Sequence, residues 1–459
     1  MAIANFNRAS LTRTLLLGVE LRPGEGRSIV AMFASLFLIL FTAYLLKPAR
    51  EMLILTEGTA EIRSYAVALQ ALLLLFFIPL YGKFSRRYSS YRFMRIVTLI
   101  CVLTLLAFAG LGGVLGVSVS VPYFVWLGAY SVMIIAQFWA FASELYNREA
   151  GERLFVIVAL GASLGAWVGS AVSRELVNYM DAYGLMVCGA GTLLLASLPS
   201  RFATLSVPPS SRGQHAVQAV QTSSVFAGFQ LVMGKYYLLL LAIFVIVLNL
   251  VNTTGEFLLA SMLEVTYAEG IASGDIDVGK GTYIGRFYST FYFFVNLSGV
   301  LIQYFLVSRL IRVGGFSVAL LATPVIVFLG YSSLALLPVI AWFRYFKVLD
   351  NSLDYSLQNT VRQMLYLPLS RQEKYEARAV IDPFGQRLGD LLQAGLIFVG
   401  LNVLGMQSMD YLPVVAVLAA VNVVVVVGIL AQRRKLLAQQ AGPAPDSGGA
   451  VQPGSVALP

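Results

Sequence analysis

The chain has few of the residues from which catalytic and metal sites are built. Its 459 residues include one histidine and two cysteines, and charged residues make up 12% of the sequence, against about 25% in soluble proteins. The histidine, His215, lies in a polar segment, which argues against a histidine-based metal site or catalytic triad. Cys101 and Cys188 lie in apolar runs, which predicts buried free thiols and no disulfide framework. We therefore expect no enzyme activity and no cofactor.

Hydrophobic residues make up 58% of the chain, and this excess predicts an integral membrane protein. Because a span needs about 20 apolar residues, the length allows about a dozen spans and no large soluble domain. We expect an all-α membrane fold with twelve spans, at 28–50, 64–82, 95–115, 121–145, 153–173, 182–200, 236–260, 285–308, 315–333, 335–362, 378–402 and 410–431.

Basic residues are concentrated in the N-terminus and in every second loop, which places those segments and both termini in the cytoplasm. The longest break, 201–235, divides the spans into two sets of six, an arrangement typical of transporters with two parallel halves. Within it, Val225–Met233 is predicted to form a short interfacial helix.

We expect a monomer in a bacterial inner membrane. Its parts are an N-terminus (1–27), two six-helix halves (28–200 and 236–431), a cytoplasmic linker (201–235) and a largely disordered tail (432–459).

The tenth span carries a ladder of polar residues. At about 100° per residue these residues share one stripe of the helix, while apolar side chains cover the other faces. A charge in the bilayer centre costs on the order of 2.5–3.5 kcal/mol, so the stripe is expected to face a protein interior or a polar cavity. The stripe consists of Arg344, Lys347, Asp350, Asn351, Asp354, Gln358 and Arg362. Such a helix indicates transport, although Lys347 and Asp350 could also form a purely structural ion pair.

Other spans also carry charges. Lys47 and Arg50 flank Pro48, and they form either an anion-binding cluster in a broken helix or a pair that reaches the interface. Glu144 could pair with Arg148 at the cytoplasmic rim. Glu256 has no basic neighbour in the sequence, which favours a functional role. The remaining candidates for a gate are Arg153, Asp382, Arg387 and Asp390.

Two glycine patterns resemble nucleotide-binding motifs, but neither has the features that such a motif requires. The segment 274–281 resembles a phosphate-binding loop but lacks the Ser/Thr that follows the lysine and has no preceding strand. Gly161, Gly165 and Gly169 recur every four residues in the fifth span, which predicts close helix packing.

Four segments resemble the nucleotide (ATP/ADP) transporter family of plastids and intracellular bacteria, with its relatives in free-living bacteria. The family is a branch of the major facilitator fold. The similarity lies in Arg22–Glu25 with Leu46–Glu51, in Phe138–Glu144 with Asn147–Phe155, in Gly161–Gly165, and in Lys374–Asp382 with Arg387–Asp390.

The resemblance implies exchange of nucleotides by alternating access without ATP hydrolysis. It also implies four functional charges in spans one, four, seven and ten, which here correspond to Lys47, Glu144, Glu256 and Lys347. The motif after span two departs from the wider superfamily because it has no aspartate.

We therefore expect a carrier of nucleotides or related phosphorylated anions, embedded in the lipid bilayer and without a nucleic-acid partner. The predicted substrate-binding residues are Lys47, Arg50, Glu144, Glu256, Arg344, Lys347, Asp350 and Asp354, and the predicted gate residues are Arg148, Arg153, Asp382, Arg387 and Asp390. Tyr44, Trp139 or Tyr292 could contact a base. Two alternatives remain: a proton-coupled exporter of small organic molecules, and a non-transporting scaffold or sensor that kept the fold.

Overall fold

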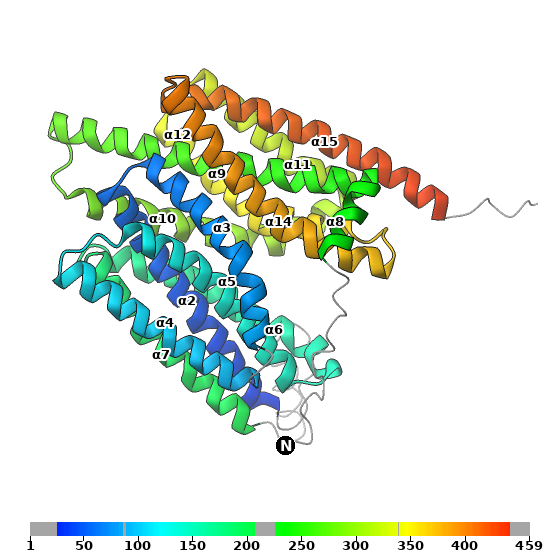
Figure 1. Ribbon diagram of the computed structural model, residues 1–459, viewed down its shortest axis with the longest axis horizontal. Coiled ribbons are helices and arrows are strands. Elements are labelled where there is room, and N and C mark those ends of the chain that lie inside the picture. The colour runs from blue at the N-terminus through cyan, green and yellow to red at the C-terminus, as the bar shows by residue number, and fades with distance from the viewer. Residues whose placement is uncertain (1–24, 86–88, 207–224, 338, 441–459) are drawn as a thin grey trace, which may run out of the picture.

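The computed structural model of the chain describes residues 25–85, 89–206, 225–337 and 339–440. Within these ranges the regular structure is helical, and the helices form two groups that lie side by side (Figure 1). We call helices α2–α7 the N-terminal half and helices α8–α15 the C-terminal half. The predicted all-α membrane fold with two halves is confirmed. His215 and most of the predicted cytoplasmic segments lie outside the described residues.

The N-terminal half contains six long helices. Helix α4 ends in a short π-helix, η1 (Gly110–Val114). The six helices are α2 (Glu25–Glu57), α3 (Ala60–Ser85), α4 (Ser90–Ala109), α5 (Ser120–Leu145), α6 (Arg148–Leu176) and α7 (Ala182–Ser206).

The C-terminal half begins with the short helix α8 (Val225–Gly234), where the sequence predicted an interfacial helix. Three of its spans contain π-helical turns. Its other elements are α9 (Tyr236–Ser273), α10 (Lys280–Leu301) with η3 (Ile302–Val307), α11 (Ser308–Leu336), α12 (Ile340–Leu353) with η4 (Asp354–Gln358) and α13 (Asn359–Leu365), α14 (Arg371–Phe398) with η5 (Val399–Val403), η6 (Ser408–Asp410) and α15 (Tyr411–Gln440).

Each of the twelve predicted spans corresponds to helical structure. By length and composition, nine segments of the described chain could cross a membrane, and one of them, Lys280–Leu336, contains two predicted spans. The two predicted spans that do not meet this criterion are 335–362 and 378–402. These spans carry the charged stripe and the Asp382–Asp390 group, so the charges themselves lower their hydropathy.

Two local features refine these predictions. Helix α2 runs without interruption through Pro48 to Glu57, so the predicted break near Pro48 is wrong; a proline removes one helical hydrogen bond without necessarily ending the helix. Between the eighth and ninth spans the chain turns at Gly315, whose φ of 72° is accessible mainly to glycine.

The glycines of α6 allow very close packing against α2. A Cβ atom on Gly161, Gly165 or Gly169 would lie 2.6, 2.2 or 2.5 Å from the carbonyl oxygen of Phe33, Phe37 or Phe41, respectively. No side chain fits at these distances, so the predicted packing role is confirmed. The segment that resembles a phosphate loop has another structural role, because Gly274 caps α9 with a φ of 82° and Lys280 pairs with Glu264.

The halves meet through α2 and α6 against α10 and through α3 against α9 and α14. Several hydrogen bonds join them near the end where α2 connects to α3, which we call the α2–α3 end. Gln393 Nε2 donates to Ser64 Oγ at 3.0 Å, the Ala60 amide donates to Glu264 at 3.0 Å, and Arg286 Nε donates to Asn178 at 2.8 Å. At the opposite end, the ion pairs Arg153–Glu25 and Lys235–Glu373 each lie within one half.

Candidate functional site

The structure gathers four of the predicted substrate residues, Arg50, Glu256, Lys347 and Asp350, into one buried network of charges. The network also includes two charged residues that the sequence did not single out, Glu51 and Arg63. Helices α2, α3, α9 and α12 supply these side chains, so the network spans both halves. We call these six residues the ion network.

In the N-terminal half, Glu51 lies between two arginines. Its side chain is fully buried; Arg63 Nε donates to its Oε2 at 2.7 Å and Arg50 Nε donates to its Oε1 at 3.0 Å. Phe124 lies beneath both guanidinium groups, whose Cζ atoms are 4.4 Å (Arg50) and 5.9 Å (Arg63) from the ring centre. The charge-assisted hydrogen bonds from the two arginines offset part of the free-energy cost of burying this carboxylate.

In the C-terminal half, Lys347 is completely buried and fully hydrogen-bonded. Its Nζ donates to Asp350 Oδ2 at 2.8 Å, to Asn252 Oδ1 at 2.6 Å and to the Asn252 carbonyl at 3.3 Å. An ammonium group has three donors, so all of them are used. Glu256 lies 3.8 Å away and accepts a hydrogen bond from Asn351 Nδ2 at 3.0 Å.

Gly255 makes room for this arrangement. A Cβ atom there would lie 1.8 Å from Tyr331 Oη and 3.2 Å from Lys347 Nζ. The absence of a side chain at this position lets α12 and α11 approach the polar segment of α9, so that Lys347 reaches the Asn252 backbone.

The two parts of the network join where Arg63 Nη2 lies 3.3 Å from Glu256 Oε2. These residues are 193 positions apart in the chain and belong to opposite halves. The ion pair therefore depends entirely on how the halves are placed against each other.

Lys47, three residues before Arg50 on α2, is not part of the ion network and contacts aromatic rings. Its Nζ is 3.9 Å from the ring centre of Tyr44 and 5.4 Å from that of Tyr292, and the two rings meet edge to face at 6.1 Å. The side chain is partly exposed, and no carboxylate in the described part of the chain forms an ion pair with it. The ammonium group is thus held by ring faces, which bind a cation more weakly than a buried carboxylate does.

This geometry distinguishes the three aromatic candidates for base contact. Tyr44 and Tyr292 lie together at Lys47, whereas Trp139 packs edge to face against Phe138 and Phe155. The structure therefore brings two of the three rings to the candidate site.

Arg344 and Asp354 lie on either side of Lys347 and Asp350 along α12 and η4. The guanidinium of Arg344 is partly buried, with its Cζ 5.3 Å from the ring centre of Phe287. Asp354 begins the π-helical turn η4 and is also partly buried. Its charged neighbours are Asp350, Arg362 and Lys347.

The predicted gate residues do not form one cluster. Arg153 pairs with Glu25 at 2.9 Å, Arg378 Nε lies 3.4 Å from Asp382, and Arg387 pairs with Asp390 at 2.9 Å. Asp390 also accepts a hydrogen bond from Asn249 Nδ2, which links α14 to α9. The side chain of Arg148 lies outside the described residues.

Glu144 lies away from the ion network. Its Oε2 accepts a hydrogen bond from the Ser90 backbone amide at 3.0 Å, near the ends of α4 and α5 distant from the α2–α3 end. Its role in substrate binding stays a prediction that this conformation does not support directly.

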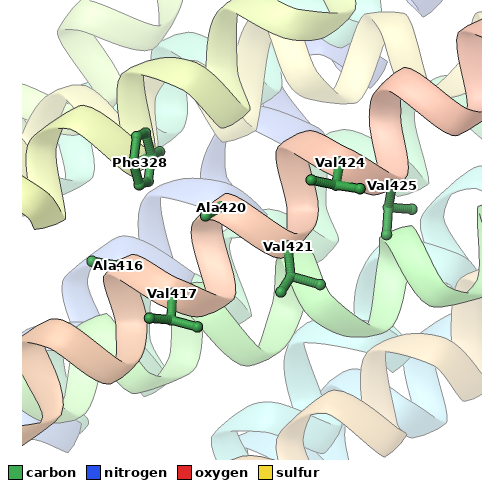
Figure 2. A pocket seen from close by; sticks show the side chains of 7 residues that line it. All are labelled: Phe328, Ala416, Val417, Ala420, Val421, Val424 and Val425. Carbon is green, nitrogen blue, oxygen red and sulfur yellow. The ribbon is translucent and has the colours of Figure 1, made fainter.

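The structure also has a groove of about 380 Å³ between α11 and α15. It is lined by Phe328 and by alanine and valine residues of α15, including Val421 and Val424, as Figure 2 shows. Because this lining offers no polar atom to orient a charged ligand, we do not place the substrate there.

Glu51 and Arg63 were missed because each has an ordinary explanation in the sequence. Arg63 looks like a basic residue at the start of a span, and Glu51 looks like a local partner of Arg50. The available signal was a glutamate and an arginine next to the predicted ends of two adjacent apolar spans, where a small extension of either helix would bury a charge that is costly without a partner.

Comparisons with known proteins agree with this fold. Residues 328–439 match the family model described as TLC ATP/ADP transporter. The chain is 24% identical over 315 residues to ADP,ATP carrier protein 1 of Chlamydia pneumoniae, an alignment that covers 59% of this chain and 58% of that protein. The corresponding protein of Chlamydia trachomatis is 22% identical over 312 residues, covering 59% of this chain and 57% of the relative. The aligned region thus spans less than two thirds of these relatives.

Solved transporters share the fold at low sequence identity. The nucleoside transporter NupG is 15% identical with a TM-score of 0.57, covering 89% of this chain and 99% of that one. The POT family transporter PepTSo is 12% identical with a TM-score of 0.60, covering 89% and 98%. The major-facilitator-type fold and the resemblance to the nucleotide transporter family are therefore confirmed.

Proposed function

We propose that the protein is a secondary transporter that exchanges nucleotides of the ATP/ADP type by alternating access, without hydrolysing them. The observation that carries the proposal is a neutral, buried ion network that joins the two halves, together with the nearby cation Lys47, for which the described residues supply no carboxylate partner. Such a network is costly in a membrane and is typical of a substrate pathway. The nucleotide is taken from the printed names of the family model and of the chlamydial carriers.

Lys47 would bind phosphate as a point charge. It needs to give up only its ring contacts to do so, whereas Lys347 would have to release a carboxylate or an amide. Once Lys47 moves to phosphate, the faces of Tyr44 and Tyr292 become available to a base. Stacking of a base on an aromatic ring contributes about 1–3 kcal/mol in nucleic-acid complexes.

With both termini in the cytoplasm, as the distribution of basic residues predicts, the α2–α3 end faces outward. Three hydrogen bonds between the halves, Gln393–Ser64, Ala60–Glu264 and Arg286–Asn178, lie near this end, which would then be the closed side of the carrier. We further propose a bacterial inner-membrane location and a monomer as the working unit.

The test is uptake of labelled ADP into proteoliposomes, with and without internal ADP. We compare the parent with Lys47→Gln, Lys47→Arg and the control Lys280→Gln, which removes an ion pair with Glu264 outside the site. We expect uptake to require internal nucleotide, to fall at least about tenfold in Lys47→Gln, to be partly retained in Lys47→Arg and to be unchanged in Lys280→Gln. Absence of nucleotide uptake by a folded parent protein would refute the proposal, whether or not ΔpH drives flux of another solute.

A further inference from the structure

Within the ion network, the two halves contribute opposite net charge. On the N-terminal side, Arg50 and Arg63 contribute two positive charges and Glu51 one negative charge, which gives +1. On the C-terminal side, Lys347 contributes one positive charge and Glu256 and Asp350 two negative charges, which gives −1.

One ion pair of the network crosses between the halves within the described residues, Arg63–Glu256 at 3.3 Å. Each of its partners has a second anchor in its own half. Arg63 is 2.7 Å from Glu51, and Glu256 accepts a hydrogen bond from Asn351 at 3.0 Å. Parting the halves would therefore break one ion pair of the network, and each of its two charges would keep a partner in its own half, which limits the electrostatic cost of opening.

The contact is also well sealed. The side chain of Arg63 is 5% exposed and that of Glu256 is 15% exposed. Ser64, the residue after Arg63 on α3, also accepts a hydrogen bond from Gln393 of the other half. Ser64 is 1% exposed. The ion pair and this hydrogen bond join the halves at the α2–α3 end, together with the hydrogen bonds Ala60–Glu264 and Arg286–Asn178.

We propose that Arg63–Glu256 is the latch of the α2–α3 end, and that an anionic substrate opens it by replacing the Glu256 carboxylate at Arg63. An anion that neutralises the +1 side removes the attraction between the halves, whereas a neutral or cationic solute cannot. Arg63 is thus a substrate-binding and specificity residue in addition to Lys47. The identity of the anion rests on the proposed function, but the latch does not.

The experiment measures opening directly, by the rate of thiol labelling at a buried reporter. Ser64→Cys is introduced into a background that carries Cys101→Ala and Cys188→Ala, and the protein is placed in nanodiscs so that a charged thiol reagent reaches both faces. The variants are Arg63→Gln, Arg63→Lys and Glu256→Gln. The matched control is Lys280→Gln, which breaks an ion pair within one half at the same end and keeps the Glu264 carboxylate that accepts from the Ala60 amide across the halves.

We expect Arg63→Gln and Glu256→Gln each to raise the labelling rate about tenfold, as loss of roughly 1.4 kcal/mol of closing energy would give. Arg63→Lys should show a smaller rise, and Lys280→Gln should show none. The double variant should label no faster than either single variant, because both remove the same contact. Added ADP should speed labelling of the parent and should have no further effect on Arg63→Gln.

Labelling of Arg63→Gln and Glu256→Gln at the parent's rate would overturn the latch, and so would an equal rise in Lys280→Gln. If Arg63→Gln does not fold, Glu256→Gln and Arg63→Lys carry the same test. If ADP has no effect on the parent while both latch variants label faster, the latch stands and the nucleotide proposal fails.

Discussion

Removal of the Lys347 ammonium should destabilise the protein strongly, because its partners would stay buried. Lys347 is completely buried and donates to Asp350 and Asn252 at distances of 2.6 to 3.3 Å. Lys347→Met leaves the carboxylate of Asp350, whose side chain is 8% exposed, without its cation. Breaking a buried pair in this way costs about 3–5 kcal/mol, which should lower the melting temperature in detergent by several degrees.

A second substitution separates stability from transport. Replacing both members, as in Lys347→Met with Asp350→Leu, should recover most of the lost stability, since apolar residues of similar size often replace a buried pair without loss. We expect the double variant to stay inactive in ADP exchange. Normal exchange by the double variant would instead make the pair purely structural.

The control is Lys235→Met, which removes a half-exposed lysine paired with Glu373. Such an exposed pair contributes about 0–1 kcal/mol. If Lys347→Met melts at the parent's temperature or at that of Lys235→Met, the reasoning from burial is refuted.

Three further predictions use the close contacts of the structure. Gly255→Ala should reduce exchange and lower the melting temperature, because its Cβ would lie 1.8 Å from Tyr331 Oη and overpacking costs about 1–3 kcal/mol. Partial recovery in Gly255→Ala with Tyr331→Phe would support this clash, and an unchanged melting temperature in the single variant would contradict it. Gly165→Leu should abolish folded protein in size-exclusion chromatography, since even a Cβ would lie 2.2 Å from a backbone oxygen of α2, and a folded variant would show that α6 can move away. Tyr292→Phe should retain ADP exchange, while Tyr292→Leu should weaken apparent ADP affinity severalfold because stacking is lost; equal affinities would exclude the ring from base contact.

The positions of the spans could be predicted from the sequence because hydropathy is a local property. A run of about 20 apolar residues is long enough to cross the bilayer wherever it lies in the fold, and helical structure lies at all twelve predicted positions. The stripe on the tenth span was equally accessible, since helical periodicity alone places Lys347 and Asp350 on one face. The role of Gly165 in packing followed from its spacing with Gly161 and Gly169.

The partners of those charges could not be predicted in the same way. Nothing near Glu256 in the sequence indicates Arg63, which is 193 residues away. Glu144 was predicted to bind substrate, and nothing in the sequence indicates that its carboxylate accepts a hydrogen bond from the Ser90 amide at the start of α4. Tyr292 lies next to Tyr44 because α10 packs against α2, whereas Trp139 packs against Phe138 and Phe155. The sequence does not indicate this difference.

The sequence by itself determined that this chain crosses the membrane in two sets of six helices and that charged residues lie within those helices. Hydropathy and helical periodicity act within one segment, so no knowledge of the packing was needed. Only the tertiary structure decided which charges neutralise each other, because Coulomb attraction and hydrogen bonding depend on distance in space. The placement of the halves made Arg63 the partner of Glu256 and left Lys47 beside two tyrosines.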